Sequence, residues 1–137
     1  MINPSGLCDV RDIAIRLQQC YTIDMKIVEQ ISVDELRRMA EKMYGTLVKA
    51  DVDVAKGIVM IDMDMHADGE AELLAQGSRQ QDLWGINLHP DKFGTDEFIE
   101  FDSMINIRPR QQNPSRDVLD VNVRQHIADI VTKVVHE

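Results

Sequence analysis

The chain has 137 residues, which suits one domain with its own core and is short for two. It carries 24 acidic and 15 basic residues, a net charge of −9. This balance disfavours direct binding to nucleic acids or anionic membranes, since both attract basic surfaces. It favours cations or a basic protein partner instead.

The composition also bounds the core and the cellular compartment. Hydrophobic residues make up 44% of the chain and aromatic residues only 4%, so an aliphatic core is expected, and some of the eight methionines could lie at an interface. Two cysteines, Cys8 and Cys20, are too few for a disulfide framework and lack zinc-site spacing. Charged residues among the first 21 argue against a signal peptide, and no apolar run has the length of a membrane span. We expect a cytoplasmic protein.

The N-terminal part predicts a helix, a strand and a second helix. Asp9 can cap the first helix, within residues 1–24, and the partly alternating segment 25–31 predicts a strand. Ser32 and Glu35 have the spacing of a capping box, and an apolar helical stripe follows them. Gly45 supplies the left-handed residue that commonly ends such a helix.

Residues 47–65 predict a β-hairpin, because apolar and polar residues alternate on both sides of Lys56-Gly57. If those two residues form the loop, the numbers of paired residues sum to 113. Val52 then lies opposite Ile61, and the neighbouring pairs on the same face are also apolar. This register is self-consistent.

The remaining elements follow in order. A short helix is predicted over 69–76, a strand over 83–89, a longer strand over 98–108, and a last helix capped by Asp120. The order α-β-α-β-β-α-β-β-α predicts a single α+β domain. We expect about five mostly antiparallel strands with the helices packed on one face of the sheet.

Four segments carry a resemblance to a known family: MKIVEQIS at 25–32, HADGEAELL at 66–74, GSRQQDLWGINL at 77–88 and FIEFDSMINIRP at 98–109. From residue 25 onward the chain resembles a bacterial family described as a domain of unknown function. The resemblance implies an intracellular bacterial protein and brings no activity, cofactor or catalytic residue. It divides the chain into an N-terminal helical extension, 1–24, and a single α+β domain, 25–137.

One polar face of the predicted hairpin is a candidate metal site. The register places Asp51 opposite Asp62, with Asp64 and His66 farther along the same face. Like charges directly opposite each other destabilise a sheet unless something offsets them, and a divalent cation would do so. The alternative is a solvated sheet face on which basic side chains screen the carboxylates.

A second candidate site is an anion clamp around the proline-bracketed loop 109–114. Arg108, Arg110 and Arg116 lie at or beside this loop, and guanidinium groups bind phosphate or carboxylate well. The alternative is that these arginines pair with acidic side chains nearby, such as Asp102.

The sequence contains no motif of a known enzyme class. Trp84, the only tryptophan, is expected in the core or at an interface. The first functional hypothesis is therefore a small, cytoplasmic, non-enzymatic interaction or accessory protein that self-associates. The alternative is a protein that binds a divalent metal or an anion and has hydrolase-type chemistry.

Overall fold

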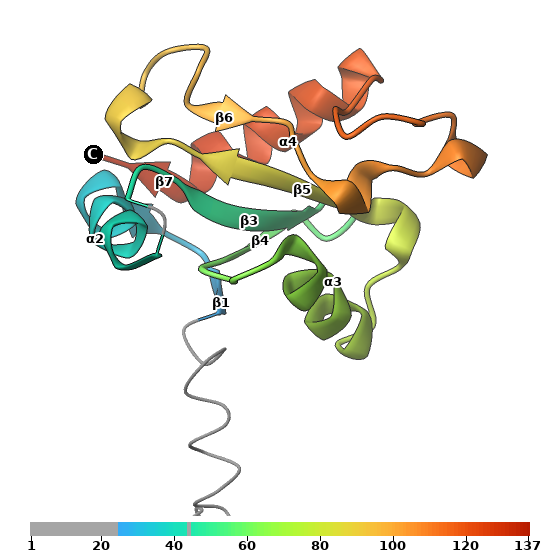
Figure 1. Cartoon of the computed structure of the whole chain (residues 1–137), viewed down its shortest axis with the longest axis horizontal. Coiled ribbons are helices and arrows are strands. Elements are labelled where there is room, and N and C mark those ends of the chain that lie inside the picture. Colours follow the sequence, from blue (N-terminus) through green and yellow to red (C-terminus); the bar gives the residue numbers. More distant parts are fainter. Residues whose placement is uncertain (1–24, 44) are drawn as a thin grey trace, which may run out of the picture.

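A five-stranded antiparallel sheet forms the centre of the structure, a computed structural model that describes residues 25–43 and 45–137 (Figure 1). The strand order is β1-β4-β3-β5-β6. The strands are β1 (Lys26–Val28), β3 (Val48–Asp53), β4 (Ile58–Ile61), β5 (Leu83–Leu88) and β6 (Ile99–Glu100). The α+β class and the antiparallel pairing predicted from the sequence are confirmed. The helix predicted within residues 1–24 lies outside the described residues.

Three α-helices and a small parallel strand pair complete the described part of the chain. The helices are α2 (Val33–Met43), α3 (His66–Ala75) and α4 (Val121–Val134). Strand β2 (Ile31–Ser32) pairs in parallel with β7 (Val135–His136). Short 3₁₀ turns cover Gln80–Asp82, Pro90–Lys92, Met104–Asn106 and Pro109–Gln111.

The capping side chains predicted for two helices, Ser32 and Asp120, accept hydrogen bonds from backbone amides in the first turn. The Ser32 hydroxyl accepts a hydrogen bond from the Glu35 amide at 3.1 Å. The Asp120 carboxylate accepts from the amides of Asn122 and Val123, at 2.8 and 3.3 Å. Each cap satisfies amide groups that have no partner within the first turn of a helix, so local sequence defines where α2 and α4 begin.

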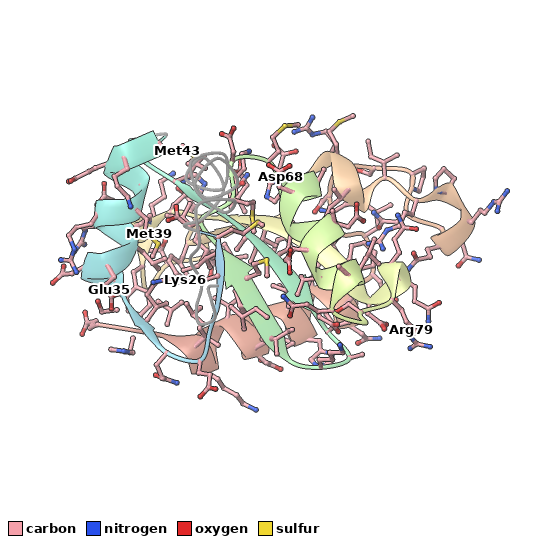
Figure 2. The ribbon with its side chains drawn as sticks, turned by 90° about the horizontal axis from the view of Figure 1, so that it is seen from below. Lys26, Glu35, Met39, Met43, Asp68 and Arg79 are labelled. Atoms are coloured by element: carbon pink, nitrogen blue, oxygen red, sulfur yellow. The ribbon has the colours of Figure 1, made fainter. Side chains whose placement is uncertain are left out.

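The helices cover both faces of the sheet, whereas the sequence predicted one. Alternate residues of β3, β4 and β5 pack with α2 and α4 in the main core, as Val52, Val59 and Ile86 do. The opposite face carries a smaller cluster in which Leu73 of α3 packs with Met60 and Leu83. Figure 1 shows α4 and α3 on opposite sides of the sheet, and Figure 2 looks onto the α3 side, with α2 and α3 at opposite ends.

The β3–β4 hairpin forms with a register two residues away from the predicted one. Val52 pairs with Val59 rather than Ile61, because four residues, 54–57, form the loop instead of two. Asp53 holds this longer loop, since its Oδ1 accepts from the amides of Ala55 and Lys56, both at 2.9 Å. A shift by two keeps each side chain on its predicted face and changes only its partner across the hairpin.

The long strand predicted over 98–108 is interrupted after two paired residues. Beyond β6 the chain turns away, and the Asn106 side chain takes the place of a neighbouring strand. Its Oδ1 accepts from the Gly85 amide at 2.8 Å, and its Nδ2 donates to the Gly85 carbonyl at 3.0 Å. Asn106 is fully buried.

A second buried asparagine closes the loop that follows. Asn113 Nδ2 donates to the carbonyls of Asn106, Ser115 and Asp117, and its Oδ1 accepts from the Leu119 amide. Polar side chains thus satisfy backbone groups that strands would otherwise pair.

We predict that Asn106→Ala lowers the free energy of unfolding by about 3 kcal/mol, because it leaves the buried amide and carbonyl of Gly85 without partners. Urea unfolding followed by circular dichroism measures this change. The exposed Asn122→Ala serves as the matched control and should change stability by less than about 0.5 kcal/mol. Equal losses in both variants would contradict the role given to Asn106.

Candidate functional site

The free edge of β6 borders an open groove of about 640 Å³. The groove runs between the β5–β6 end of the sheet and the start of α4, with side chains from the loop 115–117 on its wall. Residues distant in the sequence therefore meet here.

Three ion pairs and one contact between a histidine and a carboxylate line this groove. His89 Nε2 lies 3.1 Å from Glu100 Oε1, and Lys92 Nζ lies 3.0 Å from Glu97 Oε1. The other two pairs are Arg116–Asp102 and Arg124–Asp117, each with a nitrogen–oxygen distance of 2.5 Å.

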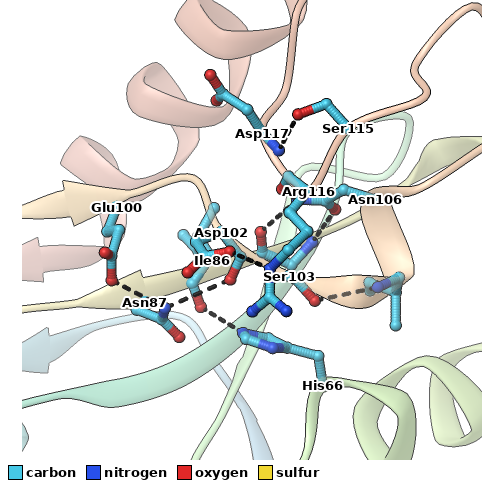
Figure 3. Close-up of polar contacts among 12 residues, drawn as sticks. His66, Ile86, Asn87, Glu100, Asp102, Ser103, Asn106, Ser115, Arg116 and Asp117 are labelled. Carbon is cyan, nitrogen blue, oxygen red and sulfur yellow. Dashed lines mark hydrogen bonds and ion pairs between the residues drawn. The ribbon is translucent and has the colours of Figure 1, made fainter.

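The acidic partner Glu100 is stabilised in its charged form. A hydrogen bond from the Asn87 side chain is the largest cause that lowers the pKa of Glu100, and His89 acts in the same direction. The groove thus presents fixed charges of both signs, as Figure 3 shows around Asp102 and Arg116.

An apolar cavity of about 380 Å³ adjoins the groove. Both hollows share Ile99 and Phe101 of the β6 segment, and the cavity extends to Phe98 and to Ala128 on α4. Phe98 packs edge-to-face against Phe93 with ring centroids 5.2 Å apart. A charged surface and an apolar surface therefore meet along one strand.

The backbone of Ile99 points to the open side of β6. The Phe98 carbonyl accepts from the His89 amide at 2.8 Å, so it faces β5. A trans peptide directs the following N–H the opposite way, which turns the Ile99 amide outward. Glu100 lies two residues after Phe98 and pairs with Asn87, so its backbone amide again faces β5. The carbonyl of Ile99, which precedes that amide across a trans peptide, therefore also points outward.

The observed register separates the residues of the predicted metal site. Asp51 lies opposite Met60 rather than Asp62, so the facing pair of carboxylates on which that hypothesis was based does not form. Asp62 follows β4 with a positive φ of 68°, and its amide donates to the Lys49 carbonyl. Within residues 25–43 and 45–137, no group of three or more His, Cys, Asp or Glu side chains could hold a metal ion.

His66, the fourth residue of that set, has a structural partner. Its Nε2 lies 2.8 Å from the Ile86 carbonyl, which can only accept, so Nε2 carries the hydrogen (Figure 3). Burial lowers the pKa of His66 to about 4. The imidazole is therefore neutral at pH 7.

Asp51 is fully buried beneath α3, and neither of its carboxyl oxygens has a hydrogen-bond partner. A Cβ placed on Gly69 would lie 2.4 Å from Asp51 Oδ2, so glycine is needed where the helix crosses this side chain. Burial raises the pKa of Asp51 well above its usual value, and the negative charges of Glu70 and Asp68 act in the same direction. The nearby backbone amide of Glu70, which does not reach hydrogen-bonding geometry, and the charge of Lys49 lower the pKa and offset only part of this effect.

The three arginines of the predicted anion clamp have different environments. Arg108 donates to the carbonyls of Gln80 and Leu83, and its guanidinium lies 4.1 Å from the Trp84 ring centroid. Arg110 is exposed on its 3₁₀ turn, and Arg116 reaches the groove. The structure therefore does not bring the three guanidinium groups together around one ligand. Trp84 is buried in the main core.

A comparison with family models matches residues 25–134 to the family described as Protein of unknown function (DUF5674). The match covers most of the chain. The chain belongs to the DUF5674 family. The resemblance expected from residue 25 onward is confirmed. No curated protein and no solved structure shows a significant match.

The DUF5674 segment contains every described element from β1 to α4, including the groove and the buried Asp51. No helix among the described residues is long and apolar enough to cross a membrane.

The groove was not among the sites predicted from the sequence. The alternation around Ile99, Phe101 and the intervening Glu100 was a visible signal of a strand with two different faces. Nothing in the local sequence indicated that this strand would lie at the edge of the sheet, beside α4.

We predict that Asp51→Asn weakens the pH dependence of stability. The folded pKa of Asp51 lies above its unfolded value, so its stabilising contribution is present below the unfolded pKa and is lost as pH rises through the folded pKa. The variant should therefore be more stable than the wild type at pH 8, and this advantage should shrink toward pH 4. Urea unfolding across this range measures it.

Asp53→Asn is the matched control on the same strand. Asp53 is equally buried but accepts from two amides and from the Ser78 hydroxyl at 2.6 Å, so its substitution should destabilise the protein. An Asp51→Asn variant that is less stable than the wild type at pH 8 would show that the carboxylate has a stabilising partner.

Proposed function

We propose that this chain is an interaction module that binds an extended peptide segment of a partner protein as an added strand on β6. The observation that carries the proposal is the outward-facing amide and carbonyl of Ile99, which border an open groove. Strand addition to a sheet edge uses such main-chain groups for affinity and adjacent pockets for side-chain selection.

The surroundings of β6 favour a peptide over a small metabolite. The groove is open and its lining includes Lys92, Phe101 and Arg124, and the apolar cavity lies beside it. A peptide strand can contact both at once, because its side chains alternate between two directions.

The alternative hypothesis, metal- or anion-dependent hydrolase chemistry, stays a prediction from the sequence. Its proposed ligands are divided between a buried Asp51, an exposed Asp64 and a hydrogen-bonded His66, and no described feature favours it over strand addition. A cytoplasmic location, a bacterial origin and self-association also stay predictions.

Ile99→Pro tests the main-chain role directly. Proline removes the outward N–H while leaving the bonds of Phe98 and Glu100 to β5 in place, a position at which edge strands tolerate proline. Decapeptides selected from a random displayed library on the wild-type protein should lose about tenfold or more in affinity for this variant, measured by fluorescence anisotropy.

Ile99→Ala is the matched control, because it shortens the same side chain and keeps the N–H. It should weaken binding much less than Ile99→Pro does. Selected peptides that bind the proline variant as well as the wild type, or a library that yields no binder, would contradict strand addition at β6.

A filled cavity provides an independent test. Ala128 is half-buried and lines the apolar cavity, so Ala128→Leu should occupy space that a peptide side chain needs and weaken binding about three- to tenfold. Gln125→Leu adds the same side chain to an exposed position of α4 outside the cavity and should leave the affinity unchanged. Equal effects of both variants would contradict a role for the cavity.

A further inference from the structure

We infer that the strand recognised at β6 alternates apolar and basic residues. This inference rests on the proposed function and adds the chemistry of the partner. It follows from the two faces of the β6 segment, from the charges that surround it and from the space beside it.

The first face is apolar. Ile99 pairs with Leu88, a residue of the main core, so the Ile99 side chain lies on the α4 side of the sheet. Phe101, two residues along, packs against the same core. The apolar cavity between these residues and α4 is therefore where every second side chain of an added strand would point.

The second face is acidic. Glu100 pairs with Asn87, and the Asn87 amide donates both to the Glu100 carboxylate at 3.0 Å and to the Asp102 carbonyl at 3.4 Å. Figure 3 shows Glu100 and Asp102 on either side of this amide. The intervening side chains of an added strand would meet the Glu100 carboxylate and, beside it, the Asp102 carboxylate, which also pairs with Arg116.

The side chains around the outer edge of β6 also carry more negative than positive charge. The two hollows are lined by five carboxylates, those of Asp96, Glu97, Glu100, Asp102 and Asp117. Three permanently charged cations accompany them: Lys92, Arg116 and Arg124. The whole chain carries −9, so a basic strand is attracted both locally and at a distance.

The same pattern disfavours a second copy of this chain as the occupant. An antiparallel pair of β6 strands centred on Glu100 would place that carboxylate opposite its own copy, and like charges opposite each other destabilise a strand pair. A lysine or arginine at those positions of the partner would instead form cross-strand ion pairs with the carboxylates. Valine, isoleucine or leucine at the alternate positions would fill the cavity.

The test uses four synthetic peptides of about eight residues, the length of an ordinary strand. Three alternate valine with lysine, with threonine or with glutamate, and the fourth carries the valines and lysines in two separate blocks. Fluorescence anisotropy at about 0.15 M salt gives their affinities. We expect the alternating valine–lysine peptide to bind about three- to tenfold more tightly than the threonine peptide, and more tightly than the block peptide. The glutamate peptide should bind most weakly.

Two double variants with the same change in net charge locate the effect. Glu100→Gln with Asp102→Asn should abolish the preference for lysine over threonine. Glu29→Gln with Glu41→Gln removes two exposed carboxylates elsewhere and should preserve that preference. Circular dichroism and thermal unfolding confirm that each variant is folded before binding is measured.

The outcomes separate the inference from the proposed function. If the lysine and threonine peptides bind equally well and Ile99→Pro abolishes both, strand addition stands and the basic pattern is wrong. If the lysine peptide binds but Ile99→Pro leaves its affinity unchanged, the binding is not strand addition and both proposals fail. If the two double variants have equal effects, the net charge of the protein explains the preference for lysine over threonine. That result would overturn the assignment to Glu100 and Asp102.

Discussion

The side-chain amide of Asn106 occupies the place of a missing strand, and much of the described structure beyond β5 depends on it. Strand β6 leaves the sheet after Glu100, which would expose the amide and carbonyl of Gly85 within the protein. Asn106 offers one donor and one acceptor in the geometry of a peptide group and pairs with both. The chain can therefore turn away at Phe101 without leaving buried polar groups unsatisfied. The short β6 and the groove beside it are consequences of this replacement of a strand by a side chain.

The two acidic side chains of β3 show how one local pattern gives opposite outcomes. Asp51 and Asp53 lie two residues apart on the same face and are equally buried. Asp53 meets a loop and a serine hydroxyl that supply three donors, whereas Asp51 lies against Gly69 of α3 and has no such donors. One carboxylate organises a turn and the other favours its neutral form. The difference comes from what the tertiary fold places above each side chain.

Helices α2 and α4 could be predicted from sequence because their capping residues act within one turn. The hairpin was predicted with the correct faces and the wrong partners, since Asp53 stabilises a longer loop than Lys56-Gly57 alone would form. The strand over 98–108 was overextended because Ser103 and Asn106 use their side chains to bind backbone groups that a ladder would otherwise pair.

The sites were harder to predict than the elements. A metal site was predicted from a facing pair of carboxylates, and a shift of two residues in register removed that pair. The groove depends on β6 being an edge strand and on α4 lying beside it, which are long-range facts. Alternation in the sequence identified the two faces of β6 but could not reveal that its outer side is open.

The small β2–β7 pair has a consequence for the order of folding. Strand β2 precedes α2 and pairs with residues that follow α4, and Gln30 also binds the Lys133 carbonyl across 103 residues of chain. Contacts of such separation carry a large loop-closure entropy and tend to form late. On the ribosome, the hairpin of β3 and β4 can assemble early, but β2 must wait until Val135 has been synthesised. Until then, the apolar side of α2 lacks part of its packing, and a nascent chain halted before that point would expose it to chaperones and proteases.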